Sequence, residues 1–328
     1  MAGPAPAGNA PPLRAQSRRA ANLPPEIRSP ISQRCHQDSG ARIVKALGPV
    51  KVVQLTPSQV ERFLAGMARD GYATSTISMT RSVLVRALRR AQRDGLVARN
   101  VAELVPCPRG TRRESRSMTL AQVEQLLAAD LPPWWRAYLY TGIMCGLRPG
   151  ELLGLRWEDV DTAAGVIRVR KSVKIAEGSG PGRVVVEDLK TERSRRTLEM
   201  PTAVASMLGA LRRDQAATRL AAGSAYTDLG LVFSRADGMP CWPGTVRSQF
   251  KRICRRAGLG EDWHPHEQRH SFVSILSDAG VDIDQIADAA GHINAAVTRS
   301  VYRHVLADKL ATAARVMDAT FRTAGGAS

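Results

Sequence analysis

The chain has 328 residues, and its 47 lysines and arginines outnumber its 30 acidic residues, which gives a net charge of +17 at pH 7. A charge of this sign and size indicates a polyanionic partner, with nucleic acid favoured over an anionic membrane surface. No apolar run approaches the roughly 18 residues that span a bilayer, and the five cysteines are scattered without paired spacing. The composition therefore excludes a membrane-spanning protein and a disulfide scaffold, and it favours a cytoplasmic protein with reduced thiols.

Residues 1–40 are rich in alanine, proline and arginine, and Glu26 and Asp38 are their only acidic residues. They contain no apolar segment of the kind found in secretory signals. We predict that they form a disordered basic arm.

Residues 41–108 are predicted to form a helical domain. Thr56, followed by Pro57 and by Gln59 three residues after the cap, forms a capping box for its first helix. Helical periodicity then predicts a longer helix over residues 75–94 and a short helix over residues 100–105.

The longer helix is strongly basic on its outer surface, with five arginines and no acidic residue between positions 81 and 93. The ordinary interpretation is a solvated helix face, but this density of arginine favours contact with DNA phosphates. Residues 109–118 are rich in proline, glycine and arginine and are predicted to be a basic linker between two domains. The candidate DNA-binding residues are Arg81, Arg86, Arg89, Arg90, Arg93, Arg112 and Arg113.

Residues 119–328 are predicted to form a second, mostly helical domain with a small β-sheet. A second capping box runs from Thr119 to Gln122, and Arg148 lies on a tight turn at the start of a helix. The pattern changes to a period of two over residues 166–173 and 184–189, which predicts strands and places Lys190 at the tip of a β-hairpin. Further helices are expected over residues 119–129, 134–145, 202–219 and 244–257.

Five of the six histidines lie between Trp263 and Val305, together with one tyrosine. A helix over residues 265–278 places two of the candidate side chains on one face, Asp282 caps a second helix that Gly291 ends, and Asn294 caps a third. Folding back at the glycines would gather a phenol, two imidazoles and a guanidinium, groups suited to attack on a phosphate. The alternatives are a solvated helix face and a tyrosine at the edge of the core. The histidine spacing does not fit a tetrahedral zinc set, and no metal site is predicted. The residues that we expect to meet are His266, Arg269, His292 and Tyr302.

These motifs together resemble the tyrosine recombinases, in particular the integrases of phages and integrative elements. The resemblance extends over residues 41 to about 310 and follows the order of the family's motifs: G-L-R-x-G-E-L at 146–152, L-K-T-x-x-S-R-R at 189–196, H-x-x-R-H at 266–270, Gly-His at 291–292 and V-Y-x-H at 301–304. It implies the catalytic set Arg148, Lys190, His266, Arg269 and His292, with Tyr302 as the nucleophile.

The resemblance implies a mainly α (α+β) fold, with a helical core-binding domain before the linker and a catalytic domain after it. It also implies a site-specific recombinase that integrates and excises a mobile element through a 3′-phosphotyrosyl intermediate, without metal, ATP or any other cofactor. The expected partners are double-stranded recombination sites in the nucleoid and three further copies of the chain, bound weakly off DNA; a directionality factor is left open. The apolar face formed by Leu306, Leu310, Ala313, Met317 and Phe321 is expected to dock on a neighbouring protomer or on the chain's own core.

Three features depart from the family pattern. Glu267 and Gln268 stand where Asp and Leu are usual, Ala290 replaces the usual Leu before Gly-His, and residues 1–40 offer no arm-site DNA-binding domain. Three alternative functions remain: a Xer-like recombinase that resolves chromosome dimers, a type IB topoisomerase with the same chemistry, and a DNA-binding remnant without activity.

Overall fold

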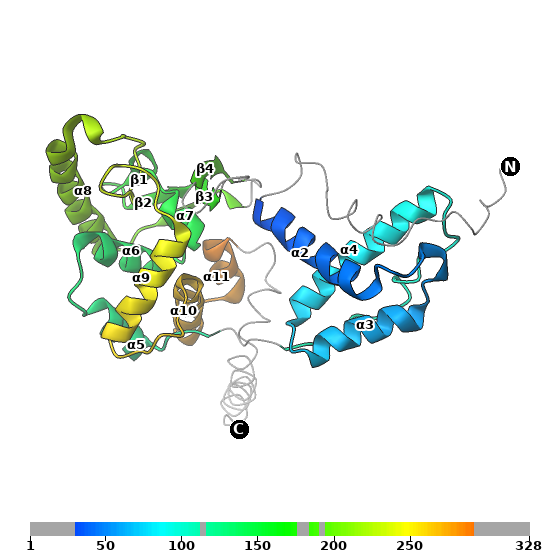
Figure 1. The fold of residues 1–328 in the computed structure, drawn as a ribbon. Coiled ribbons are helices and arrows are strands. Elements are labelled where there is room, and N and C mark those ends of the chain that lie inside the picture. Colours follow the sequence, from blue (N-terminus) through cyan, green and yellow to red (C-terminus); the bar gives the residue numbers. More distant parts are fainter. Residues whose placement is uncertain (1–29, 112–115, 176–183, 190–193, 292–328) are drawn as a thin grey trace, which may run out of the picture. The chain divides into compact units, whose positions relative to one another are not determined.

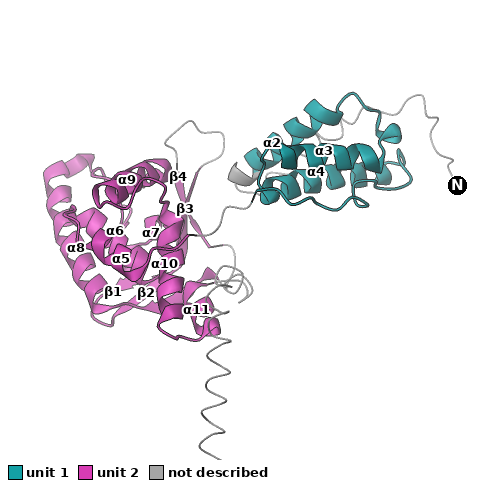
Figure 2. Ribbon diagram, turned by 90° about the horizontal axis from the view of Figure 1, so that it is seen from below, with its two compact units in different colours: residues 1–114 teal, residues 115–328 magenta. Residues whose placement is uncertain are grey.

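The computed structural model describes residues 30–111, 116–175, 184–189 and 194–291. The chain divides into two compact units, Met1–Glu114 and Ser115–Ser328 (Figure 2). Their boundary falls within residues 109–118, the segment that the sequence predicts to be a linker. None of the described helices is long and apolar enough to cross a membrane.

Unit 1 is a group of helices packed around the long helix α4 (Figure 1). Its elements are α2 (Pro30–Leu47), the 3₁₀ turn η3 (Val52–Gln54), α3 (Pro57–Arg69) and α4 (Thr74–Arg93). The apolar positions of α3 and α4 recur at helical spacing and meet in one core, since each helix buries only one stripe. That core includes Ile43, Val60, Leu64, Ile77, Leu84 and Leu88.

Helix α2 begins at Pro30, so the boundary of the predicted basic arm at residue 40 must be corrected. Part of the buried face of α2 is polar, which is why composition concealed it. His36 and Ser39 are both buried, and their partners lie on α4: Arg86 Nη2 is 2.9 Å from His36 Nδ1, and the hydroxyl of Thr80 donates to Ser39 at 3.4 Å. Buried polar groups of this kind are retained where they are hydrogen-bonded.

The short helix predicted over residues 100–105 is wrong, because this segment forms turns. Asn100 is buried, its amide donates to Val85 O at 2.9 Å, and its side-chain oxygen accepts the Ala102 N–H at 3.2 Å. Arg81 Nε donates to Val105 O at 2.7 Å. Side chains of α4 and Asn100 therefore provide the hydrogen bonds that a helix would have made internally.

Both predicted capping boxes are confirmed. Before α3, the Thr56 N–H donates to Gln59 Oε1 at 2.9 Å and the Gln59 N–H donates to Thr56 Oγ1 at 3.3 Å. Before α5 (Leu120–Leu127), Thr119 and Gln122 repeat the pattern at 3.0 and 3.3 Å. Each box satisfies backbone donors that the first helical turn leaves without partners.

Unit 2 is mostly helical, with small sheets beside the helices (Figure 1). Its core is centred on α6, whose Tyr138 is fully buried and stacks on Trp134 with ring centroids 5.2 Å apart. The helices after α5 are α6 (Pro133–Met144), α7 (Pro149–Leu153), α8 (Thr202–Ala222), α9 (Pro243–Arg256), α10 (Pro265–Asp278) and α11 (Ile283–Ala290), with 3₁₀ turns η4 (Trp157–Asp159) and η6 (Gly223–Ala225).

The strand predicted over residues 166–173 is divided at Arg170. Strand β2 (Val166–Val169) lies between β1 (Val160–Asp161) and β5 (Arg196–Glu199), whereas β3 (Lys171–Ile175) pairs with β4 (Val184–Asp188) in a separate antiparallel hairpin. Arg170 forms an ion pair with the buried Asp159, which fixes the chain where it passes from one sheet to the other. Sequence periodicity does not reveal this change, because the alternation continues through it.

The chain enters the packed part of unit 2 through Met118. This residue is buried, and its N–H donates to Ser271 Oγ on α10 at 2.8 Å. Two residues earlier, the guanidinium of Arg116 lies over the ring of Trp263, 4.2 Å from its centroid. The last residues of the predicted linker are thus attached to α10 and to Trp263, two residues before its start.

Candidate active site

The loop between α6 and α7 carries the first site residue. Gly146 has a left-handed backbone (φ +62°), and a Cβ there would lie 2.4 Å from the ring of Phe272 on α10. Glycine therefore permits both the turn and the close approach of α10. Arg148 follows as the N-cap of α7, and its N–H donates to Glu151 Oε2 at 3.0 Å. The predicted position of Arg148, on a tight turn at a helix start, is confirmed.

Glu151 is almost fully buried, and its carboxylate binds two arginines. Arg148 Nη1 donates to Oε1 at 2.7 Å, and Arg196 Nη2 on β5 donates to Oε2 at 2.9 Å. Burial alone would raise the pKa of Glu151, but the charges and hydrogen bonds of Arg196 and Arg148 outweigh it and hold the pKa below its ordinary value. Glu151 is therefore a carboxylate at neutral pH.

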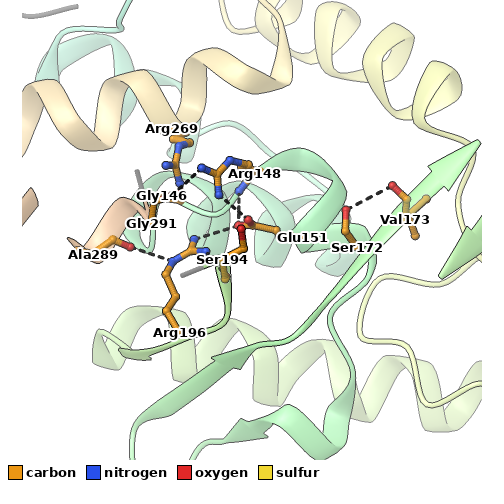
Figure 3. A network of polar contacts seen from close by, with 10 residues as sticks. All are labelled: Gly146, Arg148, Glu151, Ser172, Val173, Ser194, Arg196, Arg269, Ala289 and Gly291. Carbon is orange, nitrogen blue, oxygen red and sulfur yellow. Dashed lines mark hydrogen bonds and ion pairs between the residues drawn. The ribbon is translucent and has the colours of Figure 1, made fainter. Parts of the chain in front are cut away.

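The same arginines also bind the end of α11, as Figure 3 shows. Arg196 Nε donates to Ala289 O at 3.1 Å, and Arg148 Nη2 donates to Gly291 O at 2.7 Å. Gly291 ends α11 in a left-handed conformation (φ 64°), as the sequence predicts. The network joins α7, β5 and α11, three elements that are far apart in the chain.

Arg269 lies on α10, and only 4% of its surface is exposed. Its Nη1 donates to Gly146 O at 2.7 Å, two residues before Arg148 on the same loop. One short loop thus carries Arg148 and binds Arg269, which brings two guanidiniums to the same part of unit 2 (Figure 3).

His266 lies in the first turn of α10 and is exposed. Its pKa is lowered from the ordinary value, first because neighbouring protein displaces water and then because Arg269, Arg148 and Arg247 repel a positive imidazole. His270, one turn further on, has its pKa lowered to about 4, chiefly by desolvation and then by His266 and Arg269. Both histidines are therefore uncharged at neutral pH, and the imidazole of His266 is available to accept a proton.

The structure brings together three of the six predicted catalytic residues, Arg148, His266 and Arg269. His292 and Tyr302 lie outside the described residues, although Gly291, the residue before His292, belongs to the network. Lys190 also lies outside them; it follows β4 and precedes β5, which belong to different sheets. In the described parts of the chain, no group of three or more His, Cys, Asp or Glu side chains could hold a metal ion.

Sequence reasoning missed Glu151 and Arg196. Glu151 stands three residues after Arg148, the spacing of a capping box. Arg196 stands two residues before the buried Leu198 on β5, and it pairs with the buried Val169 of β2, so strand alternation places it on the core face. A buried cation requires an anion. The position of Arg196 on the strand and the spacing of Glu151 from Arg148 were therefore signals of this pair in the sequence.

The five arginines predicted to form one basic surface on α4 do not all lie there. Arg81 is half-buried and binds the turn after α4, and Arg86 is half-buried beside His36. Arg89 and Arg90 are exposed but are paired with Glu103 and Asp94. Among the residues that the structure describes, Arg93 is exposed without an ion pair. Arg112 and Arg113 lie outside the described residues.

Two guanidiniums beside an uncharged imidazole, in a strongly basic chain, are groups expected of an enzyme that acts on phosphodiesters. Comparison with known proteins agrees with this class. Residues 116–309 match the Phage integrase family. An integrase of Streptomyces ambofaciens is 36% identical over 300 residues, which cover 88% of this chain and 75% of that protein.

Solved structures give the same fold. The Tn1549 transposon integrase, in complex with transposon right end DNA, has a TM-score of 0.76 at 18% identity, covering 89% of this chain and 94% of that chain. A lambda integrase tetramer bound to a Holliday junction has a TM-score of 0.63 at 17% identity, covering 90% of this chain and 79% of that chain. The chain belongs to the phage integrase family, the tyrosine recombinases, which are enzymes that cleave and rejoin DNA.

Proposed function

We propose that this recombinase integrates and excises a mobile element, and that Tyr302 attacks the scissile phosphate to form a 3′-phosphotyrosyl bond. One observation carries the assignment of the site: Arg148 follows the loop whose Gly146 carbonyl accepts Arg269 Nη1, beside an uncharged His266. The integrase of Streptomyces ambofaciens, as a relative, supports integration over dimer resolution.

Arg148 is the phosphate-binding group that the geometry supports best. Its side chain is 33% exposed, and it uses one N–H of Nη1 and one of Nη2 within the protein. A guanidinium has five N–H groups, so three remain for the non-bridging oxygens of a phosphate. Arg269 is placed deeper and adds a second positive charge for the pentavalent transition state. Removing one such stabilising group typically costs roughly 3–4 kcal/mol.

Proton transfer requires a base and an acid. A phenol has a pKa of about 10 and must lose its proton as it attacks. His266 is the candidate acceptor, because its lowered pKa keeps it neutral. By the family resemblance, Lys190 protonates the departing 5′-oxygen and His292 hydrogen-bonds the phosphate. The tyrosyl–phosphate bond conserves the energy of the broken phosphodiester, and a 5′-hydroxyl from a partner strand releases Tyr302 when it attacks that bond.

The partners that we propose are double-stranded recombination sites and three further copies of the chain, bound weakly in the absence of DNA. The lambda integrase tetramer on a Holliday junction supports this assembly, and the net charge of +17 supports DNA binding. A protein that acts on such sites works at the nucleoid, in the cytoplasm. A directionality factor would control excision.

Covalent capture from expressing cells tests the function. Cells are lysed in a denaturing detergent, DNA linked to the protein is recovered and sequenced, and Tyr302→Phe serves as the control. We expect adducts that depend on Tyr302 and come from one or two discrete loci. Adducts scattered over the genome would instead indicate a topoisomerase, and equal recovery with Tyr302→Phe would exclude Tyr302 as the nucleophile.

A further inference from the structure

Arg196 is an arginine of the site for which DNA contact offers no explanation. Its side chain is only 8% exposed, and its Nη2 binds Glu151 Oε2 at 2.9 Å. The chain provides a second, more exposed arginine, Arg148, for the same carboxylate. The arrangement therefore raises the question of what the buried Arg196 contributes to the half-buried Arg148.

The two oxygens of Glu151 are divided between the two side chains. Arg148 Nη1 takes Oε1, whereas Oε2 accepts Arg196 Nη2 and the backbone N–H of Arg148. An arginine and a carboxylate without competitors favour two parallel hydrogen bonds. With Arg196 at Oε2, Arg148 keeps a single side-chain bond to Glu151, and its Nη2 turns to Gly291 O instead.

Arg196 fixes this second acceptor as well. Its Nε donates to Ala289 O at 3.1 Å, and a Cβ built on Gly291 would lie 3.1 Å from its Cδ and Nη1. The end of α11 thus rests against the Arg196 side chain, and this end presents the carbonyl that accepts Arg148 Nη2. Arg196 therefore holds in place both groups that bind the Arg148 side chain, the Glu151 carboxylate and the Gly291 carbonyl (Figure 3).

We propose that Arg196 is a positioning residue for DNA cleavage: it prevents Arg148 from forming a two-bond pair with Glu151 and so keeps the Arg148 guanidinium directed at the scissile phosphate. This inference rests on the proposed function, because it assigns Arg148 to the phosphate. It differs from a purely structural role, in which loss of Arg196 would lower stability and leave the chemistry of the folded protein unchanged.

The test uses a nicked duplex that copies a locus recovered by covalent capture, so that cleavage traps the covalent product. Single-turnover rates of adduct formation are measured over a range of full-length protein concentrations. The variant is Arg196→Met, and the matched control is Arg168→Met, which removes one positive charge from an exposed position on the neighbouring strand β2. Circular dichroism at the assay temperature verifies that each variant is folded.

For Arg196→Met we expect the rate at saturating protein to fall on the order of 10- to 100-fold, the usual effect of misplacing a reacting group. The concentration giving half the maximal rate should stay within about twofold, since phosphate contacts elsewhere dominate DNA affinity. Arg168→Met should change neither quantity. A saturating rate for folded Arg196→Met within about twofold of the unsubstituted protein would overturn the inference.

A second substitution separates positioning from structure. In Arg196→Met, Glu151 is free to hold Arg148 with both oxygens, so adding Glu151→Gln should release Arg148. The double variant is expected to cleave roughly threefold or more faster than Arg196→Met alone, the lower end of coupling between contacting residues. If Arg196 had a purely structural role, the double variant would cleave more slowly than Arg196→Met, and that result would overturn the proposal.

Arg196→Lys covers the case in which Arg196→Met does not fold. A lysine keeps the charge beside Glu151 but cannot also reach Ala289 O, so we expect a folded protein with a reduced saturating rate. An undiminished rate for this variant would contradict the inference. If the unsubstituted protein forms no adduct at all, the proposed function fails and the inference fails with it. If the protein forms adducts that depend on Arg148 but are indifferent to Arg196, only the inference fails.

Discussion

The side chain of Gln268 on α10 occupies the space that a side chain at Gly142 on α6 would need. A Cβ built on Gly142 would lie 1.9 Å from Gln268 Oε1 and 3.1 Å from Leu152 Cδ1. Gln268 is fully buried, and within the described part of the chain neither end of its amide has a hydrogen-bond partner. The contact holds α10 close to α6 beside Arg269, with a polar group where the family pattern usually has leucine.

Replacing Gln268 with leucine is therefore expected to stabilise unit 2. A buried amide without partners costs about 1–3 kcal/mol, and leucine has a similar volume without the polar atoms. Urea unfolding of Gln268→Leu should show a corresponding rise in the free energy of unfolding. The control, Gln285→Leu at an exposed position of α11, should stay within about 0.5 kcal/mol of the unsubstituted protein. A loss of stability in Gln268→Leu would show that the amide has a favourable role.

The contact itself can be tested from the side of α6. Gly142→Ala should destabilise the protein by about 1–3 kcal/mol, because the methyl group overlaps the Gln268 amide in a packed core. In a Gln268→Ala background the same substitution should cost less, since the obstructing group is absent. Equal costs in both backgrounds would mean that Gly142 is required for another reason.

Acid pH should weaken the network around Glu151. Its pKa in the folded protein is below the ordinary value of 4.5, so its contribution to stability is fully present above pH 4.5 and is lost as pH falls through the folded-state pKa. Glu151→Gln should be less stable than the unsubstituted protein at pH 7, and this difference should narrow as pH decreases below 4.5. Unfolding curves at a series of pH values measure this difference. A difference in stability that does not change with pH would contradict the conclusion that Glu151 is ionised in the folded protein.

The rate of cleavage should depend on the protonation of His266. Since its pKa lies below the ordinary 6.5, the imidazole is neutral from pH 8 to 6.5 and gains a proton only at lower pH. Protonation of His266 should therefore leave the rate of adduct formation unchanged above pH 6.5 and should decrease it on the acid side. His266→Asn should react slowly and lose this acid limb, whereas His270→Asn should retain it. If the decrease in rate at low pH persists in His266→Asn, the proton acceptor is a group other than His266.

Two arginines of α4 should respond differently to substitution. Arg93 is exposed without an ion pair among the described residues, so Arg93→Ala should weaken DNA binding and reduce the slope of log K against log salt by about one. Arg81 instead donates to Val105 O and Glu103 O, so Arg81→Ala should lower the stability of unit 1 by about 1–3 kcal/mol. Fluorescence anisotropy with a DNA duplex measures the first effect and thermal unfolding measures the second. Weaker DNA binding by Arg81→Ala together with lower stability of Arg93→Ala would contradict this assignment.

The helices around the site could be predicted because their signals are local. Asp282 caps α11, Gly291 ends it, and Pro265 opens α10, all as the sequence indicates. Each signal involves residues within a few positions of one another, where backbone geometry depends little on the rest of the fold.

The contacts that organise the site could not be predicted in the same way. Arg196 and Glu151 are 45 positions apart, and Arg148 and Gly291 are 143 apart. Nothing in the spacing of charges identifies which arginine reaches which oxygen. The start of α2 was missed for a related reason, because its buried His36 is satisfied by a helix 50 positions further along the chain.

The attachment of Met118 to Ser271 has a mechanical consequence. The hydrogen bond ties Met118, the last residue of the predicted linker, to the helix that carries His266 and Arg269. A force that reaches the second unit along the linker therefore acts on α10 as well as on the core in which Met118 is buried. The linker and Arg269 are both attached to α10, so we expect that a change in linker length also changes the rate of DNA cleavage.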